Sequence, residues 1–256
     1  CARFLVSALI AISVLTAVGP EANPALAAEA AFTSKAPRAI LIDAATGATL
    51  FQQHADEPAP PASMSKLMTL AVLFRAMKEG RIQKTDEFTM SVNAWRNGGA
   101  PSGTSAMMVP VNTKVTVDEL IQGIVIQSGN DAAMCVAEGM AGSIPAFARM
   151  MNEEAKRIGL TKSTFTNASG LPDPQQLMSA RDLAVLARYI IDEYPDYYPV
   201  FAQKEFLYRK HRFINRNPLL FQNIGADGLK TGHTAAAGFG LVGSAVKDGK
   251  RLIVVV

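Results

Sequence analysis

The sequence predicts an α+β fold, with one antiparallel sheet built from both ends of the chain, helices packed on it, and an inserted helical lobe. Residues 38–53 have the pattern of two strands, the segment from 229 onward has that of three, and helix signals fill the middle. Strands at both ends with helices between them favour this arrangement. The 256 residues, 49% of them hydrophobic, suffice for one domain with a large core.

The N-terminal segment has the features of a secretory signal peptide. Its apolar run, Phe4–Val18, is short for a membrane span and precedes Ala25-Leu26-Ala27, a small-residue cleavage pattern. We predict a signal peptide over 1–27, incomplete because it lacks an initiator Met, and a folded domain over 28–256 with the helical lobe at about 80–215. An uncleaved N-terminal anchor is the alternative. The protein is therefore expected to be exported.

Cysteine, charge and histidine usage exclude several classes of function. Without the signal segment one cysteine is left, Cys135, in an apolar helical stretch that suits a small buried side chain rather than a disulfide. The net charge of +3 is scattered and not interleaved with aromatic residues, so no nucleic-acid partner is predicted. His54, His211 and His233 lack metal-ligand spacing, and we predict no metal.

The first half of the domain begins with a predicted hairpin at 38–53. Three prolines between 58 and 61 interrupt regular structure, and 63–79 then has a strong helical pattern that Gly80 ends. The polar, glycine-rich segment 93–105 is predicted to be a loop.

Capping signals define the helices that follow. Thr116 and Glu119 form a capping box, Pro145 suits a first helical turn, and Ser179 precedes another helix start. Ser128-Gly129-Asn130 interrupts the helical pattern. Helices are predicted over 116–126, 131–140, 143–159 and 179–191.

The last part of the chain changes to strand periodicity. Strands are predicted over 229–234, 238–246 and 251–256, and Asp248-Gly249 is a typical tight-hairpin turn. The sequence stops inside the last apolar strand, so we expect the domain to be truncated at its C-terminal end.

Three short motifs, far apart in sequence, carry the chemical information. They are Ser63-Met64-Ser65-Lys66, Ser128-Gly129-Asn130 and Lys230-Thr231-Gly232-His233. Each alone also fits ordinary structure: a capping serine with an exposed lysine, a turn before a helix, and a solvated hairpin lysine. Their joint order and spacing indicate a serine enzyme whose proton carrier is a lysine.

The residue types in these motifs suit acyl transfer. Ser63 and Lys66, three residues apart at a helix start, fall on one face, so the amine can take the hydroxyl proton. Ser128 can relay a proton to a leaving amine, and Asn130 can hold a substrate amide. Lys230 and Thr231 suit a terminal carboxylate, and the charge of Lys230 lowers the pKa of a nearby Lys66.

With these motifs the chain resembles the low-molecular-weight penicillin-binding proteins, the serine-type D-Ala-D-Ala carboxypeptidases with a β-lactamase/transpeptidase-like fold. The resemblance runs from about Ala39 to Val256. It also covers Phe165-x-Asn167-x-x-Gly170-Leu171 and the flanks of the second and third motifs, together with the helix start at Ser179.

The resemblance implies a site and a substrate. Ser63 would attack the bond between the terminal D-alanines of a peptidoglycan stem peptide, with Lys66 as base and Ser128 as proton donor. The backbone N–H groups of Ser63 and His233 would form the oxyanion hole. Substrate would be bound by Asn130, Lys230, Thr231, Gly232 and His233, and Asp182 would help to order the site. β-Lactams would acylate Ser63, and no cofactor is implied.

Two departures from the family pattern stand out. Ser169 occupies a position where the family often has histidine. The family's carboxylate-binding arginine, its C-terminal β-rich domain and any membrane anchor would all lie beyond Val256.

Three alternatives remain open. A D,D-endopeptidase shares all three motifs. A class A β-lactamase would need Ser-Asp-Asn at 128–130 and a loop glutamate, whereas Glu153 and Glu154 fall in a predicted helix. A non-catalytic wall-binding module with the same fold is the third.

Overall fold

The computed structural model describes residues 33–235 and 237–256. The predicted signal peptide at 1–27 lies outside the described residues. Ser34–Val256 form one compact unit.

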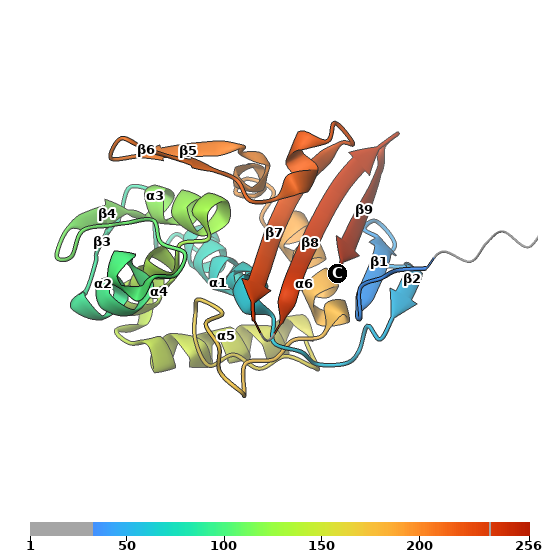
Figure 1. Cartoon of the computed structure of the whole chain (residues 1–256), viewed down its shortest axis with the longest axis horizontal. Coiled ribbons are helices and arrows are strands. Elements are labelled where there is room, and N and C mark those ends of the chain that lie inside the picture. The colour runs from blue at the N-terminus through green and yellow to red at the C-terminus, as the bar shows by residue number, and fades with distance from the viewer. Residues whose placement is uncertain (1–32, 236) are drawn as a thin grey trace, which may run out of the picture. The chain divides into compact units, whose positions relative to one another are not determined.

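The predicted α+β class is confirmed by a five-stranded antiparallel sheet that both ends of the chain build (Figure 1). The strands lie in the order β2-β1-β9-β8-β7, so the N-terminal hairpin pairs with the last strand of the sequence. Their bounds are β1 Ala39–Asp43, β2 Thr49–Gln53, β7 Ala226–Thr234, β8 Gly238–Lys247 and β9 Lys250–Val255. The predicted Asp248-Gly249 turn joins β8 to β9.

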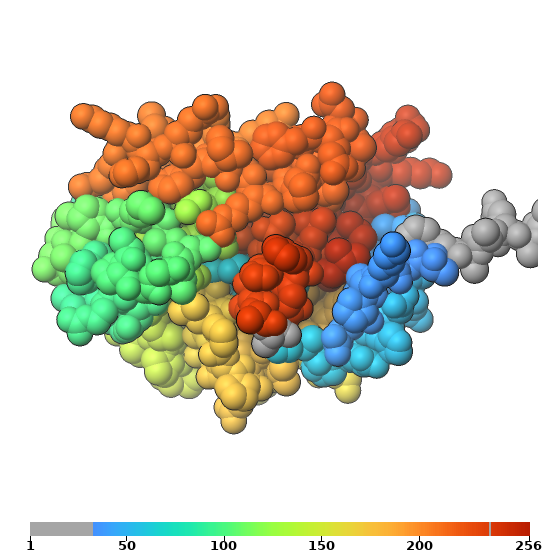
Figure 2. All heavy atoms as spheres, in the orientation of Figure 1, coloured from blue at the N-terminus to red at the C-terminus, as the bar shows by residue number. Residues whose placement is uncertain are grey.

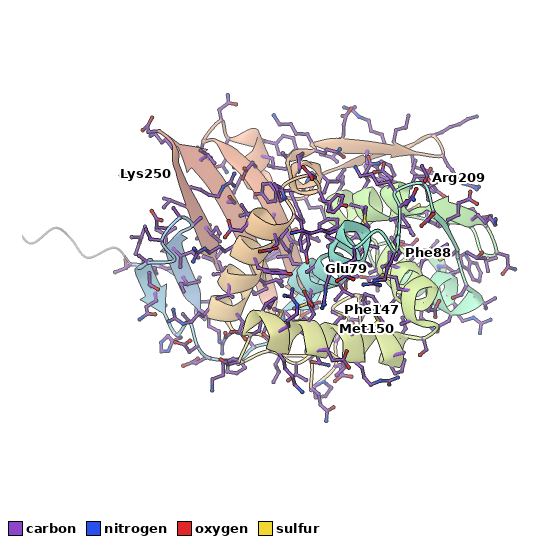
Figure 3. The ribbon with its side chains drawn as sticks, turned by 180° about the vertical axis from the view of Figure 1, so that it is seen from behind. Glu79, Phe88, Phe147, Met150, Arg209 and Lys250 are labelled. Carbon is purple, nitrogen blue, oxygen red and sulfur yellow. The ribbon has the colours of Figure 1, made fainter. Side chains whose placement is uncertain are left out.

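The register of β1 against β9 places apolar side chains in the core. Ile40 pairs with Val255 and Ile42 with Ile253, and these four side chains are buried. Helix α6 (Ala180–Glu193) packs on β1, β8 and β9 from behind, as Figure 3 shows. Burial of these side chains is the main stabilising contribution at this face.

The remaining helices stand beside the sheet, and three of the predicted helix starts are capped by a serine or threonine. Thr116, Ser143 and Ser179 each accept a hydrogen bond from a backbone N–H in the first turn of the helix they precede. The helices are α1 Lys66–Lys78, α2 Val92–Gly98, α3 Val117–Gln122, α4 Asn130–Ala141 and α5 Ile144–Ile158. A small two-stranded antiparallel sheet of β3 (Glu87–Thr89) and β4 (Lys114–Thr116), which α2 separates in the chain, lies against them.

The prediction of a loop over 93–105 is wrong in its first half. The segment forms helix α2 and a 3-10 turn at Ala100–Ser102. Ser91 caps α2 by accepting from the N–H of Ala94, which is fully buried. A Cβ on Gly98 would lie 2.7 Å from the backbone nitrogen of Asp131, so small residues let α2 pack closely on α4. Tertiary packing against α4 therefore outweighs the loop preference of this polar, glycine-rich segment.

The hairpin between α6 and β7 was not predicted. It consists of β5 (Glu205–Tyr208) and β6 (His211–Ile214), with Arg209 and Lys210 as its two-residue turn. Both turn residues have positive φ, for which Asn-Gly is the usual sequence signal. Four-residue strands around an atypical turn give little periodicity to detect.

The Cys135 side chain is 1% exposed and forms no disulfide. Burial raises the pKa of its thiol to about 12, which confirms the interpretation as a small buried side chain. Within 33–235 and 237–256, no helix combines the length and the apolar character that crossing a bilayer requires.

Candidate active site

The first motif lies where the chain enters α1. Ala62–Ser65 form a single 3-10 turn, and Lys66 is the first residue of the α-helix. Residues three apart eclipse in a 3-10 turn, so the side chains of Ser63 and Lys66 lie one above the other. The Lys66 Nζ donates to Ser63 Oγ at 2.8 Å. A serine hydroxyl and a lysine amine are therefore in contact, as their spacing predicts.

Lys66 is fully buried, and its amine makes two further contacts. Its Nζ also donates to Asn130 Oδ1 at 2.7 Å and to the carbonyl oxygen of Ser169 at 2.5 Å. Three contacts from three different parts of the chain fix the amine beneath Ser63. When the amine is neutral it has two N–H bonds, which can remain on Asn130 and the Ser169 carbonyl, and its lone pair then accepts from the Ser63 hydroxyl.

Burial lowers the pKa of Lys66 well below its ordinary value. The positive charges of Lys230 and Arg216 lower it further, and Asp131 acts in the opposite direction. The neutral form that a general base requires is thereby populated closer to neutral pH.

The second motif lies at an irregular joint between helices. After α3 the chain makes a π-helical turn at Gly123–Gln127, and Ser128 ends it with φ 62°. This left-handed backbone turns the buried Ser128 toward the same cavity as Ser63, which both residues line. Asn130 then begins α4, and its Nδ2 donates to Thr104 Oγ1 at 2.9 Å.

The third motif lies on β7, which is an edge strand of the sheet. Thr231 and His233 line the cavity that holds Ser63 and Ser128. Lys230 points inward, is 1% exposed and donates to the carbonyl oxygen of Thr231 at 3.1 Å. Burial, with the charge of Arg216, lowers the pKa of Lys230 to about 7.

Gly232 lines the same cavity and also packs against the turn that carries Ser63. A Cβ at this position would lie 3.0 Å from the carbonyl oxygen of Pro61 and 3.2 Å from the Ala62 Cβ. The glycine thus lets β7 approach this turn closely. Figure 1 shows β7 beside the start of α1.

Two adjoining cavities of about 540 and 550 Å³ form the cleft, and Ser63 lines both. The first extends over the outer face of β7 and β8, where Phe239 stacks on His233 with ring centroids 4.1 Å apart. The second runs between the 103–106 loop and Gly170-Leu171.

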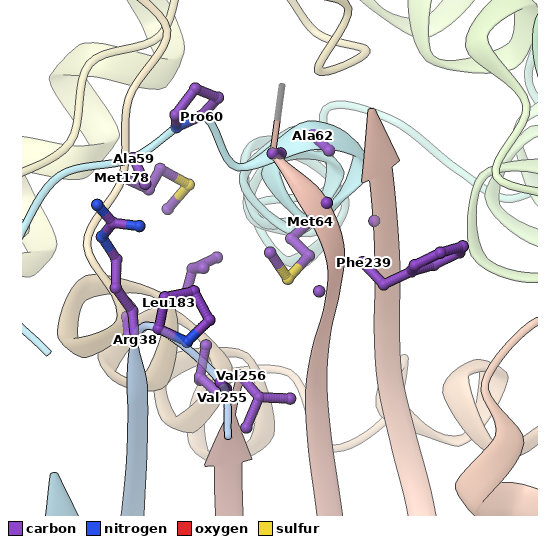
Figure 4. Close-up of a pocket in the computed structure, with 17 residues that line it drawn as sticks. Arg38, Ala59, Pro60, Ala62, Met64, Met178, Leu183, Phe239, Val255 and Val256 are labelled. Carbon is purple, nitrogen blue, oxygen red and sulfur yellow. The ribbon is translucent and has the colours of Figure 1, made fainter. Parts of the chain in front are cut away.

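A separate apolar cavity of about 290 Å³ lies at the ends of β7, β8 and β9 (Figure 4). Met64, Leu183 and Val255 line it, and Ser63 does not. Met64 follows Ser63 in the chain but lines this apolar cavity and not the cleft. This cavity offers few polar groups and no nucleophile, so we assign the chemistry to the cleft.

Functional groups that the sequence analysis did not identify complete the cleft. Arg216, from the segment after β6, lines both cavities and donates to Ser105 Oγ at 2.6 Å. The Ser169 carbonyl holds Lys66 although the side chain at 169 departs from the family pattern. A carbonyl leaves no signal in sequence, because every residue has one. A lone arginine far from the motifs is equally uninformative.

The segment before Leu171 is clamped onto α1. Thr69 Oγ1 donates to the Ala168 carbonyl at 2.7 Å, one residue before the contact with Lys66. Gly170 has φ +77°, and a Cβ there would lie 2.0 Å from the Ala62 carbonyl oxygen. Only glycine fits this close approach and this backbone conformation without strain.

Asp182 does not line the cleft. Its Oδ2 accepts from the Lys162 N–H and the Ser163 hydroxyl, both at 2.7 Å. These bonds hold the start of the segment that runs on to Ser169. Among 33–235 and 237–256, no three histidine, cysteine, aspartate or glutamate side chains gather as metal ligands would.

Comparisons with known proteins identify relatives of this chain. Residues 24–256 match the family model described as D-alanyl-D-alanine carboxypeptidase. The D-alanyl-D-alanine carboxypeptidase DacC of Escherichia coli is 43% identical over 219 residues, which are 85% of this chain and 55% of DacC. The chain thus spans about half the length of such curated relatives.

Solved structures are similar over most of the chain. Penicillin binding protein 5 from Haemophilus influenzae has a TM-score of 0.83 and 40% identity, covering 86% of this chain and 64% of that one. Penicillin-Binding Protein D2 from Listeria monocytogenes, in its ampicillin-bound form, has a TM-score of 0.73 and 28% identity, covering 86% and 88%.

Proposed function

The chain belongs to the D-alanyl-D-alanine carboxypeptidase family, and from this membership we propose that it removes the terminal D-alanine from peptidoglycan stem peptides through an acyl-enzyme on Ser63. The observation that carries the proposal is the contact of a buried Lys66 amine with the Ser63 hydroxyl at 2.8 Å. A lysine with a lowered pKa in contact with a serine is an activated nucleophile.

In the first step, neutral Lys66 takes the proton of Ser63 as the serine oxygen attacks the carbonyl of the penultimate D-alanine. Negative charge develops on the carbonyl oxygen, and the backbone N–H groups of Ser63 and His233 are the proposed donors to it. The bond to the terminal D-alanine then breaks. Ser128 passes a proton to the leaving amine and takes up the proton that Lys66 accepted, so both side chains are restored when the acyl-enzyme has formed.

Substrate is positioned by groups on both walls of the cleft. Asn130 holds a substrate amide, while Thr231 and Lys230 supply a hydroxyl and positive charge for the terminal carboxylate. Water then attacks the acyl-enzyme, releases the shortened peptide and restores Ser63. Asp182 supports the site from outside through the segment that ends at Ser169.

β-Lactams are proposed as covalent inhibitors because their strained amide imitates the scissile bond and acylates Ser63. The Listeria relative in its ampicillin-bound form supports this partner. Because the substrate lies outside the cytoplasmic membrane, we place the protein in the periplasm or on the outer face of that membrane.

Product analysis tests the proposal. A soluble pentapeptide ending in D-Ala-D-Ala should release one equivalent of free D-alanine and a tetrapeptide, while a cross-linked dimer should remain intact. Cleavage of the dimer without release of D-alanine from the pentapeptide would replace carboxypeptidase with endopeptidase activity. Rapid turnover of penicillin would instead indicate a β-lactamase.

The charge of Arg216 should contribute to the pH dependence of acylation. Burial and the charge of Lys230 lower the pKa of Lys66 most, and the Arg216 guanidinium lowers it further; acylation rises with pH as Lys66 becomes neutral. Arg216→Gln removes that charge and raises the pKa, so the rising limb of the acylation rate should move to higher pH. The second-order rate constant for a labelled penicillin, measured from pH 5 to 10, reports this shift.

Arg212→Gln is the matched control, because this arginine precedes Arg216 by four residues and pairs with Glu205 on the surface. The rising part of the pH profile of acylation by this variant should coincide with that of the wild type. If the rising part of the pH profile stays in place in Arg216→Gln, the charge of Arg216 does not influence the pKa of Lys66, whatever the absolute acylation rate is.

A further inference from the structure

The β5–β6 hairpin displays a concentration of positive charge that the proposed chemistry does not use. Between Ala202 and Pro218 the sequence contains five lysines and arginines and one acidic residue, Glu205. Glu205 is already paired with Arg212. Lys204, Arg209 and Lys210 are exposed, so the surface is left with a net positive charge.

The turn of this hairpin has cationic side chains at two positions whose left-handed backbone conformation Asn and Gly adopt more readily. Arg209 and Lys210 have φ 44° and φ 70°, a left-handed conformation that costs L-residues about 1 kcal/mol each. The β8–β9 turn has the same conformation and uses Asp248 and Gly249, the residue types typical of it. Strain retained at an exposed turn points to a role for the side chains it carries.

The outward face of the hairpin carries two exposed apolar side chains beside the Glu205–Arg212 ion pair. Leu207 is 68% exposed and Ile214 is 48% exposed, on the face opposite the buried Phe206 and Phe213. Beside them Phe221 is 51% exposed, with the Lys204 ammonium 5.7 Å from its ring centre. Exposed apolar side chains among cations are typical of an interaction surface.

The surface is continuous with the cleft. The chain leaves β6 at Ile214 and reaches Arg216, which lines both cavities beside Ser63. At about 3.3 Å per residue, the Lys210 end of the hairpin lies roughly 20 Å from Arg216 along the strand. Figure 1 shows the hairpin extending away from the sheet, Figure 2 shows its atoms in orange at the surface above the green helices, and Figure 3 places Arg209 at its far end.

We propose that this hairpin binds the polymer to which the stem peptide is attached, so that polymeric peptidoglycan is the preferred substrate over free peptide. The inference rests on the proposed function. A stem peptide in the cleft belongs to a glycan strand that carries further stem peptides, and their carboxylates are the anionic groups that Arg209 and Lys210 would meet. The exposed side chains of Leu207 and Ile214 would lie against the non-polar faces of the sugar rings.

The test replaces the turn without disturbing the fold. Arg209→Asn with Lys210→Gly installs the preferred turn residues and removes both charges, so the hairpin should be at least as stable. Lys247→Gln with Lys250→Gln removes two exposed lysines from the β8–β9 hairpin and is the matched control; Figure 3 labels Lys250 at the opposite side from Arg209.

Binding is measured by co-sedimentation with purified, protein-free sacculi at 50 mM salt, with Ser63→Ala in every variant to prevent turnover. The turn variant should bind about fivefold more weakly, and the control should bind within twofold of its parent. The deficit should shrink as salt is raised. With Ser63 intact, the turn variant should lose turnover on sacculi relative to its turnover on a soluble pentapeptide.

Equal sacculus binding by the turn variant and its parent would overturn the proposal, and so would an equal loss in the control. Binding to phosphatidylglycerol vesicles that depends on the turn, with unchanged binding to sacculi, would assign the surface to a membrane and overturn it as well. Sacculus binding is scored on Ser63→Ala protein, so failure of the catalytic proposal leaves this readout intact.

Discussion

Ser63→Ala should abolish covalent labelling of this protein by a penicillin. The Ser63 oxygen is the hydroxyl held 2.8 Å from the buried Lys66 amine, and its removal leaves the cleft without an activated nucleophile. A labelled penicillin followed by denaturing electrophoresis or mass spectrometry measures the adduct. The wild type should give one adduct per chain on the peptide that contains Ser63, and the variant should give none.

The first motif supplies its own control, because it contains a second serine. The Ser65 hydroxyl donates to the Ala62 carbonyl at 3.0 Å, is fully buried and does not line the cleft. Ser65→Ala should therefore keep the adduct. An adduct that persists in Ser63→Ala would point to a different nucleophile, and acyl transfer through Ser63 would be wrong.

Lys66→Ala should slow acylation of Ser63 by about a thousandfold or more, the range that a positioned general base contributes. The substitution removes the proton acceptor and also empties the space between Asn130 and the Ser169 carbonyl. Lys66→Met removes the amine with less loss of volume and separates these effects. Both variants should show the slow rate when labelled penicillin is followed over time.

Lys78→Ala is the control for the lysine, since Lys78 lies on the same helix but is exposed and pairs with Glu193. It should acylate at the rate of the wild type. Denaturant titration of each variant reports whether it is folded. A folded Lys66→Met protein with a near-normal acylation rate would exclude Lys66 as the base.

Local rules predicted much of the architecture because the elements concerned are specified by near neighbours. Four predicted features depend only on hydrogen bonds or backbone conformation within their own segment, and the structure contains all four. They are the Thr116 capping box, the helix starts at Ser143 and Ser179, and the Asp248-Gly249 turn. The same holds for the contact of Ser63 with Lys66, three residues apart at a helix start.

Elements that depend on distant contacts were missed. Helix α2 forms where glycine and polar residues favoured a loop, because Ala94 and Gly98 pack against α4. The β5–β6 hairpin is stabilised by burial of Phe206 and Phe213 in place of favourable turn residues. Propensity is a weak guide when tertiary packing opposes it.

By itself the sequence determined the residue types of the site and their order. It also determined the contact between Ser63 and Lys66, because residues three apart at a helix start lie on the same face. Only the tertiary structure decided what surrounds them: the Ser169 carbonyl on the lysine, Arg216 in the cleft, and Gly232 against the serine turn. The physical reason is that burial and long-range electrostatics, which set the pKa of Lys66, arise from groups up to 164 residues away in the chain, such as Lys230.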